Sequence, residues 1–265
     1  MQGELAGKVA LVYGGSGAIG GAVARAFAGA GARVFLAARG RERLDAAVAA
    51  IAADGGQAEA DCVDVLVPEA VHRHADAVAA RAGGIDAVFN AAGFVHVQGV
   101  ALAELSLEQF ELPVQRYLRS HYLIAQAAAR HLRPGGALLT IVTPVARMTG
   151  PGYLGHCVAC AGVEALWRHL AGELGPRGVR TVCLRSHAIP ETLARGSHAR
   201  EVFQPQADAA GLSIEAMLQG AAEGTVLKRL PGLDEIAGSA VYAASPRAAA
   251  MTGAILNLTS GFLVD

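Results

Sequence analysis

The first residues in this chain whose types and spacing point to chemistry are glycines that directly follow an apolar segment. Val9-Ala10-Leu11-Val12-Tyr13 is typical of a buried strand, and Gly14-Gly15-Ser16-Gly17-Ala18-Ile19-Gly20 comes straight after it, leading into an Ala-rich helical stretch. A strand, a glycine turn and a helix N-terminus can hold a pyrophosphate on backbone N–H groups, which side chains would obstruct. Gly15-x-Gly17-x-x-Gly20 therefore predicts a dinucleotide site, with an ordinary glycine turn as the alternative.

The end of the next predicted strand indicates which dinucleotide this is. Ala38 stands where an NAD site usually has an acidic residue for the ribose 2′-hydroxyl. Arg39, with Arg41 and Arg43 behind it, has the charge and geometry to pair with a 2′-phosphate. This favours NADP(H) over NAD(H). A solvated basic helix start, and with it NAD(H) or no cofactor, is the alternative.

The elements that must position these residues alternate regularly between strands and helices. Apolar runs predict strands at 8–13, 33–38, 58–63, 85–90, 137–143, 180–185 and 254–258, and Ala-rich runs predict helices at 18–30, 41–53, 68–82, 106–132, 156–174 and 233–244. Continuous apolar strands separated by helices indicate an α/β fold: a Rossmann-type, doubly wound parallel sheet in three α/β/α layers. Pro113 predicts a kink or a late start in the fourth helix. Residues 187–224 have the weakest periodicity and are predicted to form a substrate lid on a single domain, 1–265.

Composition excludes several classes of function. The 265 residues are 53% hydrophobic and carry a formal net charge of −1, which gives no electrostatic basis for binding nucleic acid or a membrane surface. No apolar run reaches membrane-spanning length, and the N-terminal residues lack the pattern of a signal peptide. We therefore expect a cytoplasmic protein. Its four cysteines form no secreted-type disulfide framework.

These features resemble the short-chain dehydrogenase/reductase (SDR) family along nearly the whole chain. Residues 31–39 resemble the second strand of its NADP-preferring members, Asp64-Val65 its adenine-contacting pair, Asn90-Ala91-Ala92-Gly93 its Asn-Asn-Ala-Gly turn, and residues 252–261 its C-terminal segment. The glycine loop departs from the usual pattern, with Tyr13 for Thr and Ala18 for Gly, and is more like the extended branch. The resemblance implies cofactor contacts from Gly14, Ser16, Gly17, Ile19, Gly20, Arg39, Asp64, Val65, Asn90, Ala91 and Gly93.

The catalytic positions implied by the resemblance hold unusual residues. The family uses a Tyr, a Lys four residues later, a Ser thirteen residues before the Tyr, and an Asn on the preceding helix. The matching positions here are His156, Cys160, Thr143 and Tyr117. In addition, Ser186-His187 replaces the Pro-Gly that usually follows the sixth strand.

A histidine makes this replacement chemically coherent. A tyrosine acid needs a neighbouring cation to lower its pKa from about 10, whereas a histidine starts near about 6.5. His156 is thus predicted to protonate a developing alkoxide, with Thr143 orienting the carbonyl oxygen. Neutral Cys160 lacks the charge with which the family's Lys grips the nicotinamide ribose, so weaker cofactor binding is expected.

Other interpretations stay open. His156 suits proton abstraction in a lyase, isomerase or cyclase equally well, or the pocket is inactive and the chain is a non-catalytic partner of an active relative. Cys157-x-x-Cys160 has redox-dithiol spacing, and with His156 and either Cys183 or His187 it offers zinc ligands, but the helix is tightly packed in the family and we expect no metal.

The remaining expectations concern other histidines and assembly. The other histidines are predicted to be surface or packing residues, with His121 and Tyr122 as substrate-contact candidates. The resemblance implies a homodimer or homotetramer formed through the long fourth and fifth helices. Small residues on the fourth (Ala125, Ala128 and Ala129) would allow the close approach that this requires.

Overall fold

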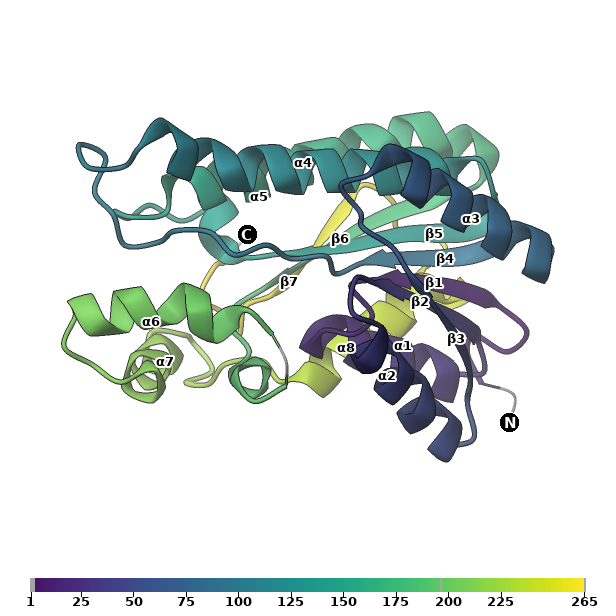
Figure 1. The fold of residues 1–265 in the computed structure, drawn as a ribbon, viewed down its shortest axis with the longest axis horizontal. Coiled ribbons are helices and arrows are strands. Elements are labelled where there is room, and N and C mark those ends of the chain that lie inside the picture. The colour runs from purple at the N-terminus through teal and green to yellow at the C-terminus, as the bar shows by residue number, and fades with distance from the viewer. Residues whose placement is uncertain (1–2, 196, 265) are drawn as a thin grey trace.

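The computed structural model describes residues 3–195 and 197–264, and they are built around one parallel sheet. Its seven strands run in the order β3-β2-β1-β4-β5-β6-β7 (Figure 1). The strands are β1 (Val9–Tyr13), β2 (Arg33–Ala38), β3 (Gln57–Cys62), β4 (Ile85–Asn90), β5 (Leu132–Val142), β6 (Arg180–Ser186) and β7 (Ala254–Leu258). Every neighbouring pair is parallel. The predicted doubly wound α/β fold is confirmed.

Helices cover both faces of this sheet. They are α1 (Ala18–Gly29), α2 (Arg41–Ala53), α3 (Pro68–Ala82), α4 (Leu107–Ala129), α5 (Leu154–Leu174), α6 (Ala199–Ala209), α7 (Ile214–Glu223) and α8 (Leu233–Ala244). Figure 1 shows α3, α4 and α5 on one face and α1, α2 and α8 on the other, with α6 and α7 together at the end where α4 begins. None of the helices in the described ranges is long and apolar enough to cross a bilayer.

Two cores explain why the strands are continuously apolar. Along β1, Leu11 and Tyr13 point into the core beneath α3, α4 and α5, whereas Ala10 and Val12 point into the core above α1, α2 and α8. Alternate side chains of a strand face opposite sides of the sheet, so a strand buried on both faces needs apolar residues throughout.

The strand order fixes where a ligand can bind. β1 pairs with β2 on one side and with β4 on the other, so the chain reverses its direction of winding between β1 and β4. Loops leaving the carboxyl ends of such strands diverge and leave a crevice between them. The glycine run after β1 and the Asn90 turn after β4 both lie at this point.

The structure refines two predictions about the elements. Helix α4 begins at Leu107 and has no late start, because Ser106 caps it: the Gln109 N–H donates to Ser106 Oγ at 3.2 Å and the Ser106 N–H to Gln109 Oε1 at 3.0 Å. Pro113 therefore lies inside the helix. The lid segment, residues 187–224, contains α6 and α7, whose apolar faces pack into a small core of their own around Ala207, Ile214 and Leu218.

The outer face of α4 also differs from the expectation. Ala125 and Ala128 are buried against the sheet, and Ala129 packs partly against the same core. Ala125 and Ala128 allow α4 to lie close to the sheet, and these two residues do not form a surface for a second copy.

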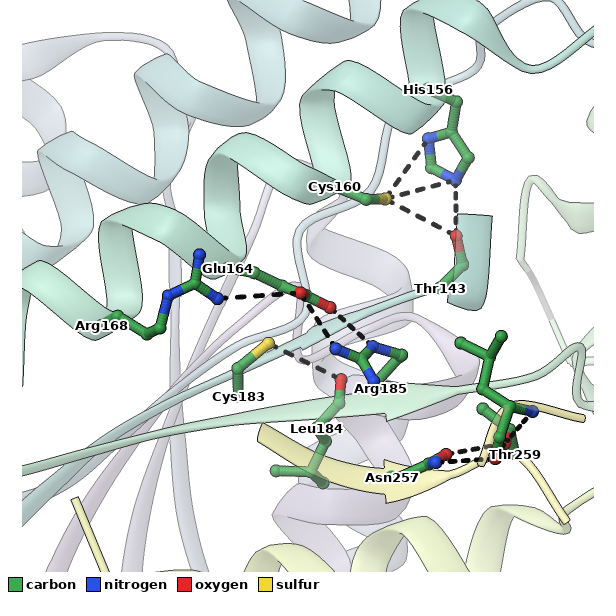
Figure 2. A network of polar contacts seen from close by, with 11 residues as sticks. Thr143, His156, Cys160, Glu164, Arg168, Cys183, Leu184, Arg185, Asn257 and Thr259 are labelled. Carbon is green, nitrogen blue, oxygen red and sulfur yellow. Dashed lines mark hydrogen bonds and ion pairs between the residues drawn. The ribbon is translucent and has the colours of Figure 1, made fainter. Parts of the chain in front are cut away.

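A buried ion pair joins α5 to β6. Glu164 Oε1 accepts from Arg185 Nε at 2.7 Å and Oε2 accepts from Arg185 Nη2 at 3.0 Å (Figure 2). Both side chains are almost wholly buried. The two-point contact fixes the orientation of α5, which carries the candidate catalytic residues, relative to the end of β6.

Replacing Glu164 tests this contact. Glu164→Ala leaves the Arg185 guanidinium buried without this carboxylate, so we expect the free energy of unfolding to fall by about 3 kcal/mol. Urea denaturation followed by circular dichroism measures the change. Glu173→Ala, at an exposed position of the same helix, is the control and is expected to change stability by less than about 0.5 kcal/mol. Equal effects of the two substitutions would contradict a stabilising role for the pair.

Candidate active site

Glycines at the end of β1 form a close contact between two loops. Gly14 has φ +74°, and a Cβ there would lie 2.6 Å from the carbonyl oxygen of Ala91. A Cβ at Gly20 would lie 2.2 Å from the carbonyl oxygen of Gly14. Neither position accepts a larger residue without moving backbone. The loop after β1, the start of α1 and the turn after β4 can therefore lie this close together only because Gly14 and Gly20 have no side chains.

The start of α1 offers backbone donors to an anion. Gly17 is its N-cap and supplies no side-chain hydrogen bond to the first turn. The N–H groups of the first helical residues, which include Ala18 and Ile19, have no acceptor within the helix. Ser16 is half-buried in the loop just before them. Gly15 has a packing role, because a Cβ there would meet the Leu36 side chain at 2.9 Å.

The predicted adenine and ribose contacts lie on the neighbouring strand ends. Arg39 is exposed just beyond β2 and forms no ion pair with any residue that the structure describes. Asp64 follows β3, where its Oδ1 accepts from the Leu66 N–H at 2.9 Å, and Val65 beside it is buried. Strands β2 and β3 are adjacent, so these residues share one edge of the sheet.

Asn90, at the carboxyl end of β4, carries an unsatisfied donor. Its Oδ1 accepts from the Ala92 N–H at 3.0 Å, while its buried Nδ2 has no hydrogen-bond partner in the described part of the chain. A buried amide without a partner is costly and is explained when a ligand supplies the acceptor. Together with the glycine contacts and the uncapped helix, this donor fits a bound dinucleotide.

The catalytic candidates meet at the carboxyl end of β5 and the start of α5. Figure 2 shows Thr143, His156 and Cys160 as one cluster. Thr143 Oγ1 lies 3.1 Å from His156 Nε2 and 3.5 Å from Cys160 Sγ. Cys160 Sγ lies 3.7 Å from His156 Nε2 and 3.8 Å from Nδ1. Residues 156 and 160 are one helical turn apart, which places both side chains on the face that looks toward Thr143.

Histidine rings and a tyrosine surround this cluster. His96, from the loop after β4, stacks on His156 with ring centroids 4.0 Å apart. Its Nδ1 donates to the Phe94 carbonyl at 2.8 Å, and its Nε2 lies 2.8 Å from Gln98 Nε2. Tyr117 packs its ring 5.6 Å from that of His156 and its hydroxyl accepts from the Phe94 N–H at 3.4 Å. His198, from the lid segment, lies against Gly93, where a Cβ would come within 2.3 Å of its ring.

Burial sets the protonation of these groups. It lowers the pKa of His156 well below 6.5, and the neighbouring His96 and His198 lower it further. Burial also lowers the pKa of His96 to about 4 and raises that of the Cys160 thiol to about 11. The pKa of the Tyr117 hydroxyl is raised by the same desolvation. At neutral pH the cluster therefore contains neutral imidazoles and a neutral thiol, and His156 is a base.

This arrangement gives no support to metal or dithiol chemistry. Within the described ranges no group of three or more His, Cys, Asp or Glu side chains is placed to hold a metal ion. Cys157 and Cys160 are free thiols, and the raised pKa of Cys160 makes its thiolate scarce at neutral pH.

Sequence reasoning missed three residues of the site and wrongly placed two others. His96 and His198 lie beside His156 and Gln98 hydrogen bonds with His96, although the two histidines were predicted to be surface or packing residues. Conversely, His121 is buried in the core, with Nε2 2.8 Å from Thr140 Oγ1 and its ring against Trp167. Tyr122 is 53% exposed and accepts from Gln126, so neither lies at the site. In the sequence, only their position shortly after strand β4 indicated that His96 and Gln98 lie near the site.

Known proteins share this fold and much of this sequence. A family model described as Enoyl-(Acyl carrier protein) reductase matches residues 15–263. D-threitol dehydrogenase of Mycolicibacterium smegmatis is 31% identical over 264 residues, which cover 98% of this chain and 95% of that protein. The chain belongs to the short-chain dehydrogenase/reductase family. The resemblance read from the sequence is thereby confirmed.

Solved SDR structures agree over the whole length. A short-chain dehydrogenase/reductase from Serratia marcescens matches with a TM-score of 0.84 and 28% identity, covering 98% of this chain and 99% of that one. A short chain dehydrogenase from Burkholderia cenocepacia in complex with NADP matches with a TM-score of 0.81 and 28% identity, covering 98% and 99%. This protein is thus an SDR-type oxidoreductase scaffold in which His156, Cys160, Thr143 and Tyr117 occupy the positions that the sequence assigned to catalysis.

The buried histidines make the stability of this SDR protein sensitive to acid. Burial lowers the pKa of His74, His96 and His121 from 6.5 to about 4, so each binds a proton more readily in the unfolded chain. Between pH 6.5 and about 4 the unfolded state binds more protons, and stability falls as pH falls. At pH 5 each of the three is expected to cost about 2 kcal/mol relative to pH 7 or above.

Urea denaturation at pH 7.5 and pH 5 measures this loss. His74→Gln is expected to reduce the difference between the two pH values by about 2 kcal/mol, whatever its effect at pH 7.5. The exposed His169 supplies the control, since His169→Gln is expected to leave the difference unchanged. An unaltered acid loss in His74→Gln would contradict the lowered pKa.

Proposed function

We propose that the protein is an NADP(H)-dependent oxidoreductase that interconverts an alcohol and a carbonyl, with His156 in the place of the usual tyrosine. The observation that carries the proposal is the 3.1 Å contact between His156 Nε2 and Thr143 Oγ1, in surroundings that keep the imidazole neutral. A neutral imidazole accepts a proton, so the favoured direction at neutral pH is oxidation of the alcohol. This refines the expectation from sequence, in which His156 acts as the proton donor.

Each side chain of the cluster has a separate task in this reaction. The alcohol O–H bond breaks and its proton goes to Nε2 of His156, while the C–H hydride leaves for the nicotinamide. Thr143 holds the substrate oxygen beside that nitrogen through its hydroxyl. Tyr117 and neutral Cys160 exclude water and maintain the low polarity that keeps His156 unprotonated. Dissociation of the proton to solvent then restores the base.

The dinucleotide is held mainly at its phosphate and adenosine end. Gly14, Ser16, Gly17, Ile19 and Gly20, at and just before the first turn of α1, would hold its pyrophosphate. Arg39 would pair with the 2′-phosphate, Asp64 and Val65 would contact the adenine, and Asn90, Ala91 and Gly93 would hold the ribose that carries the nicotinamide. Bound NADP⁺ supplies the hydride acceptor. With Cys160 neutral, this site lacks a cation at the nicotinamide ribose, and affinity depends more heavily on Arg39.

Removal of the base tests the catalytic proposal. His156→Gln keeps a group able to hydrogen bond with Thr143 but removes the basic nitrogen, so kcat/KM for NADP⁺-dependent alcohol oxidation is expected to fall by about 100-fold or more. Binding of NADPH, measured by fluorescence, is expected to survive. In the unsubstituted protein kcat/KM should stay level through neutral pH and fall only in acid, well below pH 6.5, as His156 gains a proton.

His169→Gln, at an exposed position of the same helix, is the control for that experiment. Turnover in His156→Gln within threefold of the control would reject the role of His156 as base. A pH profile centred on an ordinary histidine pKa near 6.5 would reject the low-polarity surroundings as the feature that matters.

Arg39 tests the choice of dinucleotide. Arg39→Ser removes the proposed partner of the 2′-phosphate, and affinity for NADPH is expected to fall by about tenfold while affinity for NADH changes little. Fluorescence titration with both dinucleotides measures this. Arg73→Ser, at an exposed site on α3, should alter neither affinity. An equal loss of affinity for NADPH and NADH would show that Arg39 does not bind the 2′-phosphate.

A second candidate function rests on the same neutral base. His156 can abstract a proton from carbon without any hydride transfer, as in an isomerase, lyase or cyclase. Such an enzyme would keep its activity after the dinucleotide is removed. A strict requirement for NADP⁺ or NADPH would exclude it.

We also propose that the protein functions as a homo-oligomer. Leu107, Leu154 and Val158 lie exposed on α4 and α5 and supply apolar surface for a second copy. Mixed assembly with an active relative is the alternative, and co-purification of such a relative would favour it.

A further inference from the structure

A pocket lies beside His96, the residue whose ring stacks on His156. It has a volume of about 420 Å³, is open to solvent, and is lined by the loop after β4, the first turns of α4 and helix α6. His96 lines it, so the ring that stacks on His156 also forms part of the pocket wall. Its volume falls in the range that small-molecule sites occupy. Val95, Val97 and Leu112 give it an apolar surface.

The polar groups of this pocket are mostly hydrogen-bond acceptors. The Phe94 carbonyl can only accept, so Nδ1 of His96 carries the proton and its neutral Nε2 accepts from the Gln98 amide nitrogen. Gln98 is 92% buried, and its carbonyl oxygen has no hydrogen-bond partner among the described residues. This oxygen is an acceptor available to whatever enters the pocket.

Two carboxylates add to this acceptor character. Glu108, in the first turn of α4, and Glu201, in the first turn of α6, both line the pocket. Neither forms an ion pair or hydrogen bond with another described residue, and the described lining contains no lysine or arginine. Both residues are exposed, and their two negative charges beside the apolar surface of the pocket make it unfavourable to carboxylates and phosphates.

Building on the proposed function, we propose that the substrate is an amino alcohol: a small apolar body with a hydroxyl at one end and a protonated amine at the other. The ammonium group lies between Glu108 and Glu201 and donates to Gln98 Oε1, while the apolar body contacts Val95, Val97 and Leu112. The hydroxyl points toward His156. Because His96 lines the pocket and also stacks on His156, its ring turns aside when the carbinol enters, which exchanges the Gln98–His96 hydrogen bond for contacts with the substrate.

Three probes with one carbon skeleton test the substrate class: trans-4-aminocyclohexanol, cyclohexanol and trans-4-hydroxycyclohexanecarboxylate. Calorimetric titration of the protein, with and without saturating NADPH, measures binding without turnover, and NADP⁺ reduction at pH 7.5 measures kcat/KM. We expect the amine to bind about tenfold more tightly than cyclohexanol, as two partly exposed ion pairs provide, and the hydroxy acid to bind most weakly.

Three variants assign the preference to the pocket. Glu108→Gln and Glu201→Gln are each expected to reduce the preference for the amine about threefold. Glu69→Gln is the matched control, because Glu69 lies in the first turn of α3 as Glu108 does in α4, and it should leave the preference unchanged. Rising ionic strength should weaken binding of the amine and leave that of cyclohexanol unaffected.

The outcomes separate this proposal from the redox function. Amine binding that depends on both carboxylates supports the substrate class even where no NADP⁺ is reduced, a result that would count against the oxidoreductase instead. Oxidation of all three probes without preference for the amine would overturn the substrate class and leave the oxidoreductase standing. Failure of all three to bind, or an unchanged preference in both pocket variants, would also overturn it.

Discussion

The side-by-side parallel pairing of β1 and β4 is the constraint on which the rest of the structure depends. Because the chain winds away from this pair in both directions, the loops after β1 and β4 diverge at the carboxyl edge of the sheet. Gly14 and Gly20 then allow the two loops and the start of α1 to approach within contact distance of one another. The proposed pyrophosphate and nicotinamide-ribose residues lie at that junction, and the catalytic cluster lies beside it, at the end of β5 and the start of α5.

Desolvation determines the chemistry of the cluster. Thr143 and Cys160 on one side and His96 on the other remove His156 from water, so its neutral form is favoured. The family's tyrosine needs a nearby cation in order to work, but a buried imidazole needs none to act as a base. With histidine in the position of the tyrosine, the site no longer needs the positive charge of the lysine, so the two replacements are linked electrostatically.

The reaction centre and the proposed substrate pocket differ in how far their polar groups are satisfied by hydrogen bonds. Around His156 the polar groups are neutral and largely satisfied, whereas beyond His96 an amide oxygen and two carboxylates have no partners among the described residues. Unsatisfied acceptors beside an apolar wall select a ligand rich in donors. His96 belongs to both regions, since its ring stacks on the base and the residue also lines the pocket.

The sequence by itself determined the sheet, most helix boundaries, the glycine junction and the positions of Thr143, His156 and Cys160. These features depend on local periodicity or fixed spacing, and helix 41–53 and strand 33–38 have the bounds predicted for them. Helices α6 and α7 were not predicted because each buries only a few apolar residues. These residues form a small core of their own around Ala207, Ile214 and Leu218. Only the tertiary structure brought His96 and His198 to His156 and turned Ala125 and Ala128 inward. No spacing links a loop after β4 to a helix sixty residues later, so the burial that sets the pKa of His156 is a property of the folded chain alone.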